Sequence, residues 1–590
     1  MAHRGPDGDG SATLDVAGWD AAVVHRRLAI IDLSDDAAQP MHEPSSGAVL
    51  VFNGEIYNYQ LVRERLVGLG HTFSTRSDTE VLLKAYLAWG TDALAHLEGM
   101  FAFALWDPRK QLLFLARDRF GIKPLYYHAT ADRFVFGSEV RSLLASGVVP
   151  RTLNVDMVAP FLHTGSVTSP DTLVRDVHSL APGHFAIWRD GRLTATRYWA
   201  LSQAMETGQP VPSREELSHT FVSAVKSEMV SDVPVGLFLS GGVDSSALVS
   251  ALADEGDLRT VSLVFEEAAY DERAFSRRVA ERFGTHHTEI EVSASSVSED
   301  LRQLPGRQDQ PSVDGLNTFL VSRAAREAGL TVALSGLGGD ELFAGYHTFR
   351  VARRWNLVRP LFALPQAIRS AAGAALRPVA GQRGHKAARM LREVHELADV
   401  YELAREVHSR DRIRELTARP VTLPPLAVDA VRNPVNTMTL LESGHYMLDT
   451  TLRQADTMSM AVSLEVRVPL LNHRLAELAM RVPPSRRFRG GTPKPLILDA
   501  LPVPLPPEVV ERRKGTFTLP FAVWLRNEHR ALVEELLFGK RTVARGLVDQ
   551  AAVRRLWSDF LAGRAGVGWA HVWALCTLEG WCRHNLDVAT

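Results

Sequence analysis

Residues 235–246 read Val-Gly-Leu-Phe-Leu-Ser-Gly-Gly-Val-Asp-Ser-Ser and decide the fold of the second half of the chain. The apolar run Val235–Leu239 is typical of a buried strand, and Ala247–Ala253 behind it is typical of a helix. Glycines between them let the backbone turn tightly, and the N–H groups that open a helix face an anion. Asp244 fits beside phosphates only if Mg²⁺ lies between them. The stretch therefore predicts a site for nucleotide phosphates and a metal, and a serine-capped turn is the structural alternative.

The composition excludes several classes of protein. The chain has 590 residues, a formal net charge of −2 and two cysteines, Cys576 and Cys582. This length predicts roughly two to four domains, and the near-neutral charge does not favour nucleic-acid binding. No signal peptide is recognised, and no run of about 18 apolar residues predicts a membrane span. Two cysteines argue against a disulfide framework and favour a cytoplasmic location, and we interpret both as buried small apolar residues.

The chain divides into two parts of different character. Residues 1–200 contain short apolar or alternating runs between turn signals, which predict an antiparallel β-sandwich. The predicted strands are 23–33, 48–57, 100–107, 112–118 and 134–137, and the predicted helices are 61–69 and 79–89. Residues 201–213 are polar and contain Gly and Pro, so we place a linker there.

Residues 214–590 alternate strands with helices before becoming mostly helical. The predicted strands are 235–239, 260–264, 288–292 and 332–334, and helices such as 272–283 and 317–328 lie between them. This alternation predicts a parallel α/β sheet that binds ligands at the carboxyl ends of its strands. Residues 350–395 are rich in Arg and Ala with few acids, which predicts a solvated helical surface, with a docking face as the alternative.

A second glycine loop follows the strand at 332–334. It reads Ser335-Gly336-Leu337-Gly338-Gly339-Asp340-Glu341 and again leads into a helix. Asp340 lies at the predicted helix start, so a capping role is its structural alternative. Two such loops at the ends of two parallel strands face one crevice, where Asp244 and Asp340 are predicted to share a Mg²⁺ ion bound to a triphosphate.

Taken together, these motifs resemble those of a known enzyme family. The loop 240–246 resembles the pyrophosphate loop of ATP pyrophosphatases. With the second loop, Arg453–Met460 and Ser463–Pro469, it resembles the synthetase domain of glutamine-dependent asparagine synthetases. The first 200 residues resemble the glutaminase domain of that family in the stretches 3–7, 27–32, 53–58, 77–80, 117–125 and 138–139. The resemblance implies an N-terminal α+β sandwich of the Ntn-hydrolase type (1–200), then an α/β ATP-pyrophosphatase domain with a helical C-terminal part (214–590).

The resemblance also implies a reaction. Such enzymes transfer AMP from ATP to the side-chain carboxylate of aspartate, and ammonia then displaces AMP. Positive charge, oriented N–H groups and Mg²⁺ must hold the leaving pyrophosphate. By position in the family pattern, the ATP-binding candidates are Leu239, Ser240, Gly241, Gly242, Asp244, Ser245, Ser246, Val264, Ser335 and Gly336. The catalytic candidates are Lys494, Asp340, Glu341, Arg453, Asp456, Glu465 and Arg467.

Two of these assignments have structural alternatives. Lys494 is expected to meet the phosphate and the acyl-adenylate, and is otherwise one exposed lysine among many. Arg453, Asp456, Glu465 and Arg467 are expected to shape the acceptor pocket, although Glu465 and Arg467 fit a structural ion pair equally well.

In the glutaminase half, the resemblance implies a glutamine site. Arg27 is expected to grip the glutamine carboxylate and Asp78 its α-ammonium group. Asn53 and Gly54 fit an oxyanion hole, and Glu55 follows them in the same motif. The implied partners are the small molecules ATP, aspartate and glutamine or ammonia, and a homodimer is a family-level expectation.

The chain departs from the family at its start. Family glutaminases use an N-terminal cysteine as nucleophile, whereas this chain begins Met1-Ala2-His3-Arg4. One explanation is that Met1 is an internal methionine of a longer protein. The other is an ammonia-dependent synthetase that lost its nucleophile. We favour the first, because the glutamine-binding residues are all still present.

A second departure concerns the acceptor. Leu337 stands where characterised asparagine synthetases carry an acid, and leucine cannot accept a proton. Asn472 stands where the family usually has Asp. Two alternatives to an asparagine synthase therefore stay open: an amidotransferase for another carboxylate, such as a glycan or peptide precursor, and a non-catalytic ATP-binding protein.

Overall fold

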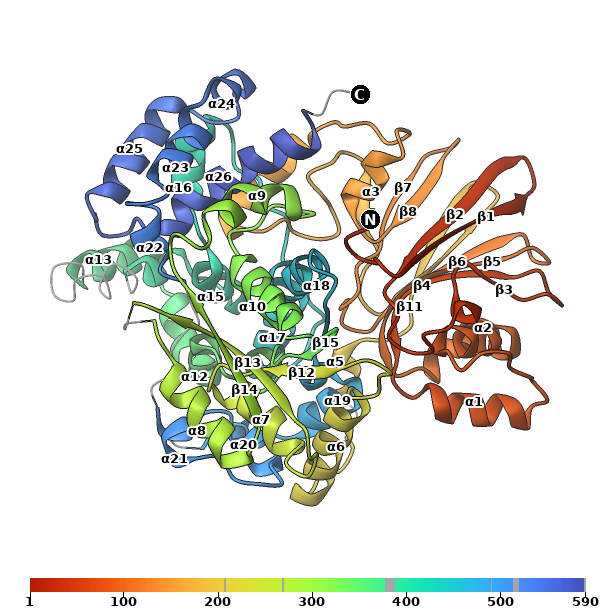
Figure 1. Ribbon diagram of the computed structural model, residues 1–590. Helices are drawn as coiled ribbons and strands as arrows, with labels where there is room; N and C mark the ends of the chain where they lie inside the picture. The colour runs from red at the N-terminus through yellow and green to blue at the C-terminus, as the bar shows by residue number, and fades with distance from the viewer. Residues whose placement is uncertain (206–207, 268–269, 377–387, 490, 513–518, 588–590) are drawn as a thin grey trace.

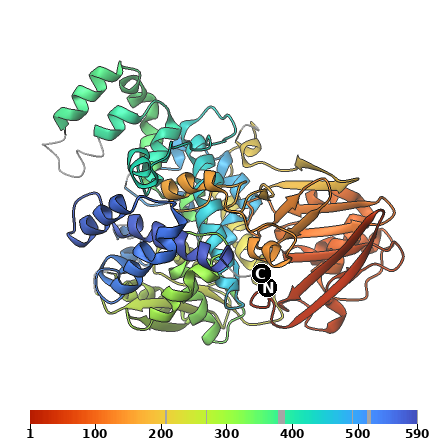
Figure 2. The same cartoon turned by 90° about the horizontal axis from the view of Figure 1, so that it is seen from above.

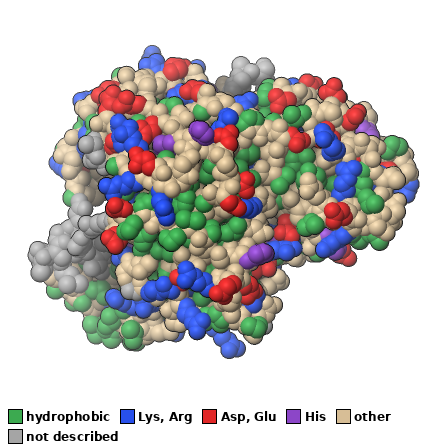
Figure 3. All heavy atoms as spheres, turned by 60° about the horizontal axis from the view of Figure 1, so that its bottom comes forward, with side chains coloured by type: hydrophobic (Ala, Val, Ile, Leu, Met, Phe, Trp, Pro, Cys, Tyr) green, Lys and Arg blue, Asp and Glu red, His purple; other side chains and the backbone are tan. Residues whose placement is uncertain are grey.

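The computed structural model describes residues 1–205, 208–267, 270–376, 388–489, 491–512 and 519–587. It contains an antiparallel N-terminal part and a parallel α/β part that lie side by side (Figure 1). On the face shown in Figure 3, Lys and Arg side chains are mixed with Asp and Glu, and apolar side chains gather near the middle. No helix of the described ranges is both long enough and apolar enough to cross a membrane.

The N-terminal part is an antiparallel sandwich, as predicted. Its strands are β1 (Gly8–Val16), β2 (Trp19–Arg27), β3 (Met41–His42), β4 (Val49–Ile56), β5 (Gly99–Asp107), β6 (Leu112–Arg117), β7 (Tyr126–Ala129), β8 (Phe134–Gly137), β9 (Val177–Ser179), β10 (His184–Arg189) and β11 (Arg192–Arg197). They form a six-stranded sheet in the order β11-β10-β6-β5-β4-β3, a β1-β2 ribbon and a β8-β7-β9 sheet. Its helices are α1 (Tyr59–Gly68), α2 (Asp78–Trp89), α3 (Val140–Ala145) and α4 (Val158–Thr164).

The C-terminal part is built on a five-stranded sheet. Its strands are β12 (Val235–Phe238), β13 (Arg259–Phe265), β14 (His286–Val292), β15 (Val332–Leu334) and β16 (Glu465–Arg467). They are all parallel, in the order β14-β13-β12-β15-β16. The chain moves outward from β12 to β14, then returns to the other side of β12 as β15. Such a topological switch point is where open α/β sheets bind ligands.

Helices cover this sheet and extend beyond it. Around the sheet lie α6 (Arg214–Ser227), α7 (Val243–Ala251), α8 (Arg273–Phe283), α9 (Ser298–Arg307), α10 (Leu316–Glu327), α11 (Gly339–Leu342), α18 (Arg453–Met460), α19 (His473–Arg481), α20 (Pro495–Ala500) and α21 (Pro507–Glu511). The remaining helices are α12 (His347–Phe362), α13 (Gln366–Leu376), α15 (Leu397–Arg405), α16 (Arg410–Thr417), α17 (Pro434–Leu441), α22 (Phe521–Trp524), α23 (Arg530–Phe538), α24 (Lys540–Arg545), α25 (Gln550–Leu561) and α26 (Trp569–Asn585). A π-helical stretch, Glu442–Leu452, joins α17 to α18.

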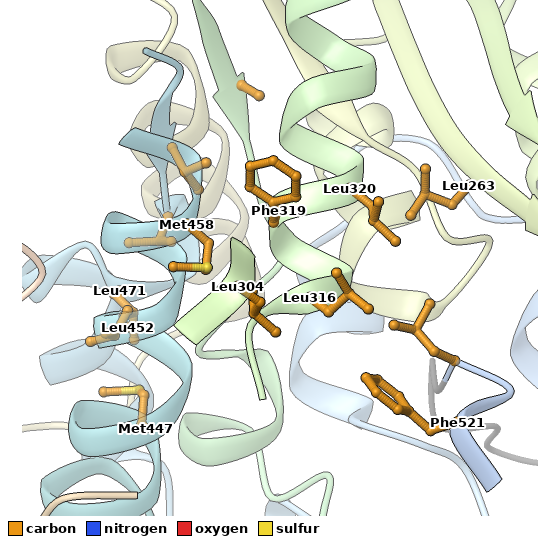
Figure 4. Packing of buried hydrophobic residues seen from close by; sticks show 14 of the residues in the cluster. Leu263, Leu304, Leu316, Phe319, Leu320, Met447, Leu452, Met458, Leu471 and Phe521 are labelled. Atoms are coloured by element: carbon orange, nitrogen blue, oxygen red, sulfur yellow. The ribbon is translucent and has the colours of Figure 1, made fainter. Parts of the chain in front are cut away.

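The core of the C-terminal part is centred on α10. Figure 4 shows Leu316, Phe319 and Leu320 of this helix between Leu263 of β13 and Met458 of α18, and all five side chains are buried. A buried apolar face of this kind holds α10 on the sheet and α18 on α10.

The predicted boundaries need two corrections. The run 23–33 is a strand only to Arg27, because β2 ends there and the chain turns toward the C-terminal part. The predicted linker 201–213 is not loose at its start, where α5 (Leu201–Ala204) buries Leu201 and Ser202 donates to Asp429 at 2.5 Å. Residues 206–207 of that linker lie outside the described ranges.

Candidate functional site

Two glycine loops meet at the switch point of the parallel sheet. The loop after β12 leads into α7, and the loop after β15 leads into α11, while Leu237 and Leu334 pair in neighbouring strands. Gly336 touches the first loop so closely that a Cβ there would lie 2.8 Å from the Cβ of Asp244. Gly241 has φ of 65°, a conformation that favours glycine, and a Cβ there would lie 2.6 Å from the Cβ of Phe275. Glycine at 336 allows the two loops to approach each other, and glycine at 241 allows the first loop to pack against α8.

Lys494 joins the two loops. Its Nζ lies 2.5 Å from an Oδ of Asp340 and also contacts an Oδ of Asp244. Burial disfavours the charge on Lys494, but Asp244 and Asp340 outweigh burial and raise its pKa. Lys494 is 7% exposed, so the alternative of an ordinary surface lysine is wrong. An ammonium group held between two carboxylates marks a place where positive charge can meet a phosphate chain.

Around these charges lies a cleft of about 1910 Å³. Most of the predicted ATP-binding residues line it, namely Leu239, Ser240, Gly242, Asp244, Ser245, Ser335 and Gly336, together with Asp340, Glu341 and Lys494. Gly241, Ser246 and Val264 are not among its lining residues, since Ser246 is fully buried and the neighbouring Leu263 faces the cleft in place of Val264.

One wall of the cleft was not predicted. Arg405 lies between two tyrosines, with its guanidinium carbon 4.1 Å from the ring centre of Tyr346 and 3.7 Å from that of Tyr446. Glu442 holds the same guanidinium at 2.6 Å, and Tyr346 donates its hydroxyl to Glu341 at 2.8 Å. Tyr346 and Glu341 follow the second glycine loop, whereas Arg405 and Tyr446 lie about 60 and 100 residues further on, so only the fold brings these groups together.

Two side chains beside this wall bear on the chemistry of the cleft. Leu337 presents an apolar side chain to it and packs partly against the core. Glu341 is buried, and burial together with the charge of Asp340 raises its pKa to about 7. A carboxyl group that titrates near neutral pH suits proton transfer.

The four predicted acceptor-pocket residues lie elsewhere. Arg453, Asp456, Glu465 and Arg467 are buried where the two parts of the chain meet, and none lines the cleft. Asp456 accepts from Arg4 at 2.7 Å and pairs with Lys123 at 3.3 Å, while Arg453 donates to the hydroxyl of Ser169 at 3.0 Å. Arg453 also pairs with Asp449 at 2.9 Å. The acceptor-pocket assignment is therefore corrected, because these charges are held by buried partners outside the cleft.

Arg467 is the centre of this contact. It pairs with Glu465 at 2.9 Å and, across the interface, with Glu55 at 2.9 Å. It also donates to the carbonyls of Glu228 and Val230, each at 2.7 Å. The structural ion pair was thus the correct alternative for Glu465 and Arg467.

Replacing Arg467 by alanine is expected to destabilise the protein by about 3–5 kcal/mol, because two buried carboxylates lose their partner. Urea unfolding followed by tryptophan fluorescence measures the change. Arg555→Ala, which removes an exposed ion pair with Glu415, is the matched control and should cost at most about 1 kcal/mol. Equal effects of the two variants would contradict the structural role.

A second cavity, of about 900 Å³, lies in the N-terminal part. All five predicted glutamine-binding residues line it: Arg27, Asn53, Gly54, Glu55 and Asp78. They come from β2, β4 and the start of α2. The guanidinium of Arg27 donates to the carbonyl of Ser34 at 2.7 Å, and Gly54 has φ of 146°, a conformation that favours glycine.

Two carboxyl groups of this cavity have pKa values above their ordinary range. Asp78 accepts from the backbone N–H of Ile56 at 3.0 Å, and burial raises its pKa to about 6. Burial and the charge of Asp78 also raise the pKa of Glu55, against the opposing charge of Arg467.

Neither cysteine of the chain belongs to this cavity. Cys576 and Cys582 lie in α26 and are fully buried, as predicted for small apolar residues. Burial raises the pKa of Cys582 to about 12 and that of Cys576 further. Neither thiol is placed to act as a nucleophile on a ligand of the N-terminal part.

Asn472, the smaller departure in sequence, has a structural role. It caps α19, where its side-chain oxygen accepts from the backbone N–H groups of Arg474 and Leu475 at 3.0 and 3.3 Å. Asn and Asp serve almost equally well at such a position, so the change carries no functional consequence that the structure supports.

Comparison with known proteins agrees with this architecture. Residues 1–199 match the family model of the glutamine amidotransferase domain, and residues 216–583 match that of asparagine synthase. The chain therefore belongs to the asparagine synthase family and is an enzyme of the ligase class.

Several curated relatives match nearly the whole chain. Asparagine synthetase [glutamine-hydrolyzing] 1 of Bacillus subtilis is 32% identical, over 100% of this chain and 93% of its own length. A putative asparagine synthetase of Mycobacterium bovis is 34% identical, over 95% of this chain and 89% of its own length. Amidase chyE of Penicillium rubens is 26% identical, over 94% and 88% respectively. Among solved structures, the glutamine phosphoribosylpyrophosphate amidotransferase of B. subtilis covers 53% of this chain and 67% of its own, with 16% identity and a TM-score of 0.23.

Proposed function

We propose that the protein uses ATP to activate a carboxylate and amidates it with ammonia, most simply converting aspartate to asparagine. The observation that carries this proposal is the contact of Lys494 with Asp244 and Asp340 between the two glycine loops. A purely structural ATP-binding protein has no need for a buried lysine between two carboxylates. ATP use is typical of the family, and the names of the two bacterial relatives favour aspartate as the acceptor.

In this proposal, the first step is the transfer of AMP to the acceptor carboxylate. An oxygen of the acceptor carboxylate attacks the α-phosphorus of ATP, the bond to the β-phosphate breaks, and pyrophosphate leaves. Lys494 and the N–H groups of the two loops hold the charge on the leaving group. Asp244 and Asp340 would hold Mg²⁺, since two carboxylates with phosphate oxygens and water suit this ion. When bound, Mg²⁺ neutralises charge on the phosphates.

In the second step ammonia attacks the acyl carbon, and the bond to AMP breaks. The attacking nitrogen must lose a proton, which Leu337 cannot accept. Glu341 lines the same cleft and has a pKa near neutrality, so we assign it the role of proton acceptor.

The assay is pyrophosphate release with Mg-ATP, aspartate and ammonium. Turnover above the rate without aspartate supports the proposal, and no release at any aspartate concentration would contradict aspartate as acceptor.

A second acceptor class is favoured by a specific observation. Leu337 makes part of the acceptor side apolar, and the cleft of about 1910 Å³ exceeds the roughly 300–1,000 Å³ of most small-molecule pockets. An acceptor carboxylate on a larger molecule, such as a glycan or peptide precursor, fits that space. Failure with aspartate but release with a larger carboxylate would favour it.

We further propose that the cavity of the N-terminal part binds glutamine. Arg27 meets the carboxylate of glutamine and Asp78 its ammonium group, with Asn53 and Gly54 beside the side-chain amide. Glu55, whose carboxylate Arg467 holds, closes the wall toward the other domain. A cytoplasmic location and a homodimer stay predictions.

This assignment predicts a pH dependence of glutamine binding. Asp78 must be ionised to pair with the ammonium group, and its pKa is about 6. Affinity should therefore rise with pH up to about 6 and level off above it, with a Kd at pH 5 about tenfold weaker than at pH 7. Isothermal calorimetry with the intact chain measures this. In Asp78→Asn, binding should be weak and independent of pH, and an unchanged pH profile would contradict the role of Asp78.

A further inference from the structure

Helices α12 and α13 form an arm that projects from the C-terminal part (Figure 2). One side of α12 is anchored in a local core, where Phe349, Ala352, Trp355 and Phe362 are buried. The other side faces outward, and neither the cleft nor the interface between the two parts accounts for its exposed apolar side chains. The sequence had left open whether this region is a solvated surface or a docking face.

The outward side of the arm carries large apolar side chains. Leu357 is 81% exposed, Leu361 51%, Leu364 43% and Ile368 54%. The four-residue spacing of Leu357 and Leu361 places them one above the other on α12. Scattered exposed leucines are ordinary, but four large apolar side chains exposed on one projecting arm are typical of an interaction surface.

The same arm is strongly basic. Helices α12 and α13 contain five arginines and no Asp or Glu, in a chain whose net charge is −2, and of the five only Arg369 is buried. Arg350, Arg353 and Arg354 are exposed one to two turns before Leu357 on the same side of α12, and Arg359 follows it. Across the described residues, neither Arg350 nor Arg354 forms an ion pair with a carboxylate. The arm therefore offers positive charge and apolar side chains together, without acids.

The positive charge of the arm distinguishes between the partners that could bind its outward side. A second copy related by two-fold symmetry would bring arginines against arginines, and like charges repel. An anionic bilayer matches both kinds of side chain, because it offers phosphate groups at its surface and acyl chains just below.

We propose that the α12–α13 arm docks onto an anionic lipid surface. Leu357, Leu361 and Ile368 enter the boundary of the acyl chains, and the arginines of α12 meet the lipid phosphates. Arg350, Arg353 and Arg354 also line the cleft, so docking brings the mouth of the cleft beside the lipid surface.

The test is co-sedimentation of the intact protein with vesicles of phosphatidylcholine alone and of phosphatidylcholine with phosphatidylglycerol. We expect binding to the anionic vesicles only, weakened by high salt. Leu357→Ser with Leu361→Ser should lower the partition coefficient at least about tenfold, and Arg359→Gln roughly fivefold. Val67→Ser with Leu69→Ser, which changes two equally exposed apolar residues on the N-terminal part, is the matched control and should bind as the parent does.

Several outcomes would overturn the proposal. They are equal binding to both kinds of vesicle, binding to neither, or undiminished binding of the double leucine variant. If ultracentrifugation finds a dimer that Leu357→Ser with Leu361→Ser converts to a monomer, the face joins two copies instead. Binding to polyglutamate without binding to vesicles would identify an acidic protein as the partner. Pyrophosphate release by the double leucine variant should equal that of the parent, which confirms its folding.

Discussion

Replacing Lys494 by alanine is expected to lower the rate of pyrophosphate release about 10²–10³-fold. Removing one preorganised charged group from developing phosphate charge costs this much in comparable sites. The variant also leaves Asp244 and Asp340 facing each other without their shared cation. We therefore expect Mg-ATP to stabilise the variant less than the parent in thermal unfolding, which measures binding independently of turnover.

Two further variants make this result interpretable. Lys494→Arg keeps the charge but changes its shape, so we expect partial activity. Lys540→Ala removes an exposed lysine from the start of α24 and should leave both measurements unchanged. If Lys494→Ala kept more than about a third of the parent rate, Lys494 would not act on the leaving pyrophosphate and the proposed mechanism would be wrong.

The 590-residue chain is expected to use ammonium and not glutamine as its nitrogen source. Glutamine hydrolysis by covalent catalysis needs an activated nucleophile, and both cysteines are buried in α26, outside the glutamine cavity. With Mg-ATP and acceptor, product formation with glutamine should be at least about 10²-fold slower than with ammonium. Amino-acid analysis of the product with each nitrogen source measures this ratio.

The control for this experiment is Cys576→Ala with Cys582→Ala. It should keep the ratio unchanged, since neither thiol takes part. Equal rates with glutamine and ammonium would contradict the prediction, and a loss of glutamine-dependent turnover in the double variant would assign one of the cysteines a catalytic role that its burial argues against.

Local sequence predicted the elements that hold the ligands. The strands β12 and β15 and their glycine loops appear where the apolar runs and turn residues placed them. The five glutamine-site residues, which the family resemblance implied, also line one cavity. The positions of strands, turns and helix starts depend on residues nearby in the sequence, so the local pattern of apolar and turn residues predicts them well.

Side-chain contacts between residues far apart in the sequence could not be predicted from local pattern. Asp456 was assigned to an acceptor pocket from its motif, yet its partner Arg4 lies hundreds of residues away. No sequence pattern predicted that Arg405 lies between Tyr346 and Tyr446.

The sequence by itself determined the fold class of each part and the positions of the two glycine loops. Both follow from the spacing of apolar residues and glycines over a few neighbouring positions. The tertiary structure alone decided that Lys494 lies between Asp244 and Asp340, and that Arg467 ties the sheet to Glu55. The partners of a buried charge are set by how distant elements pack together, and a local sequence pattern contains no information about that packing.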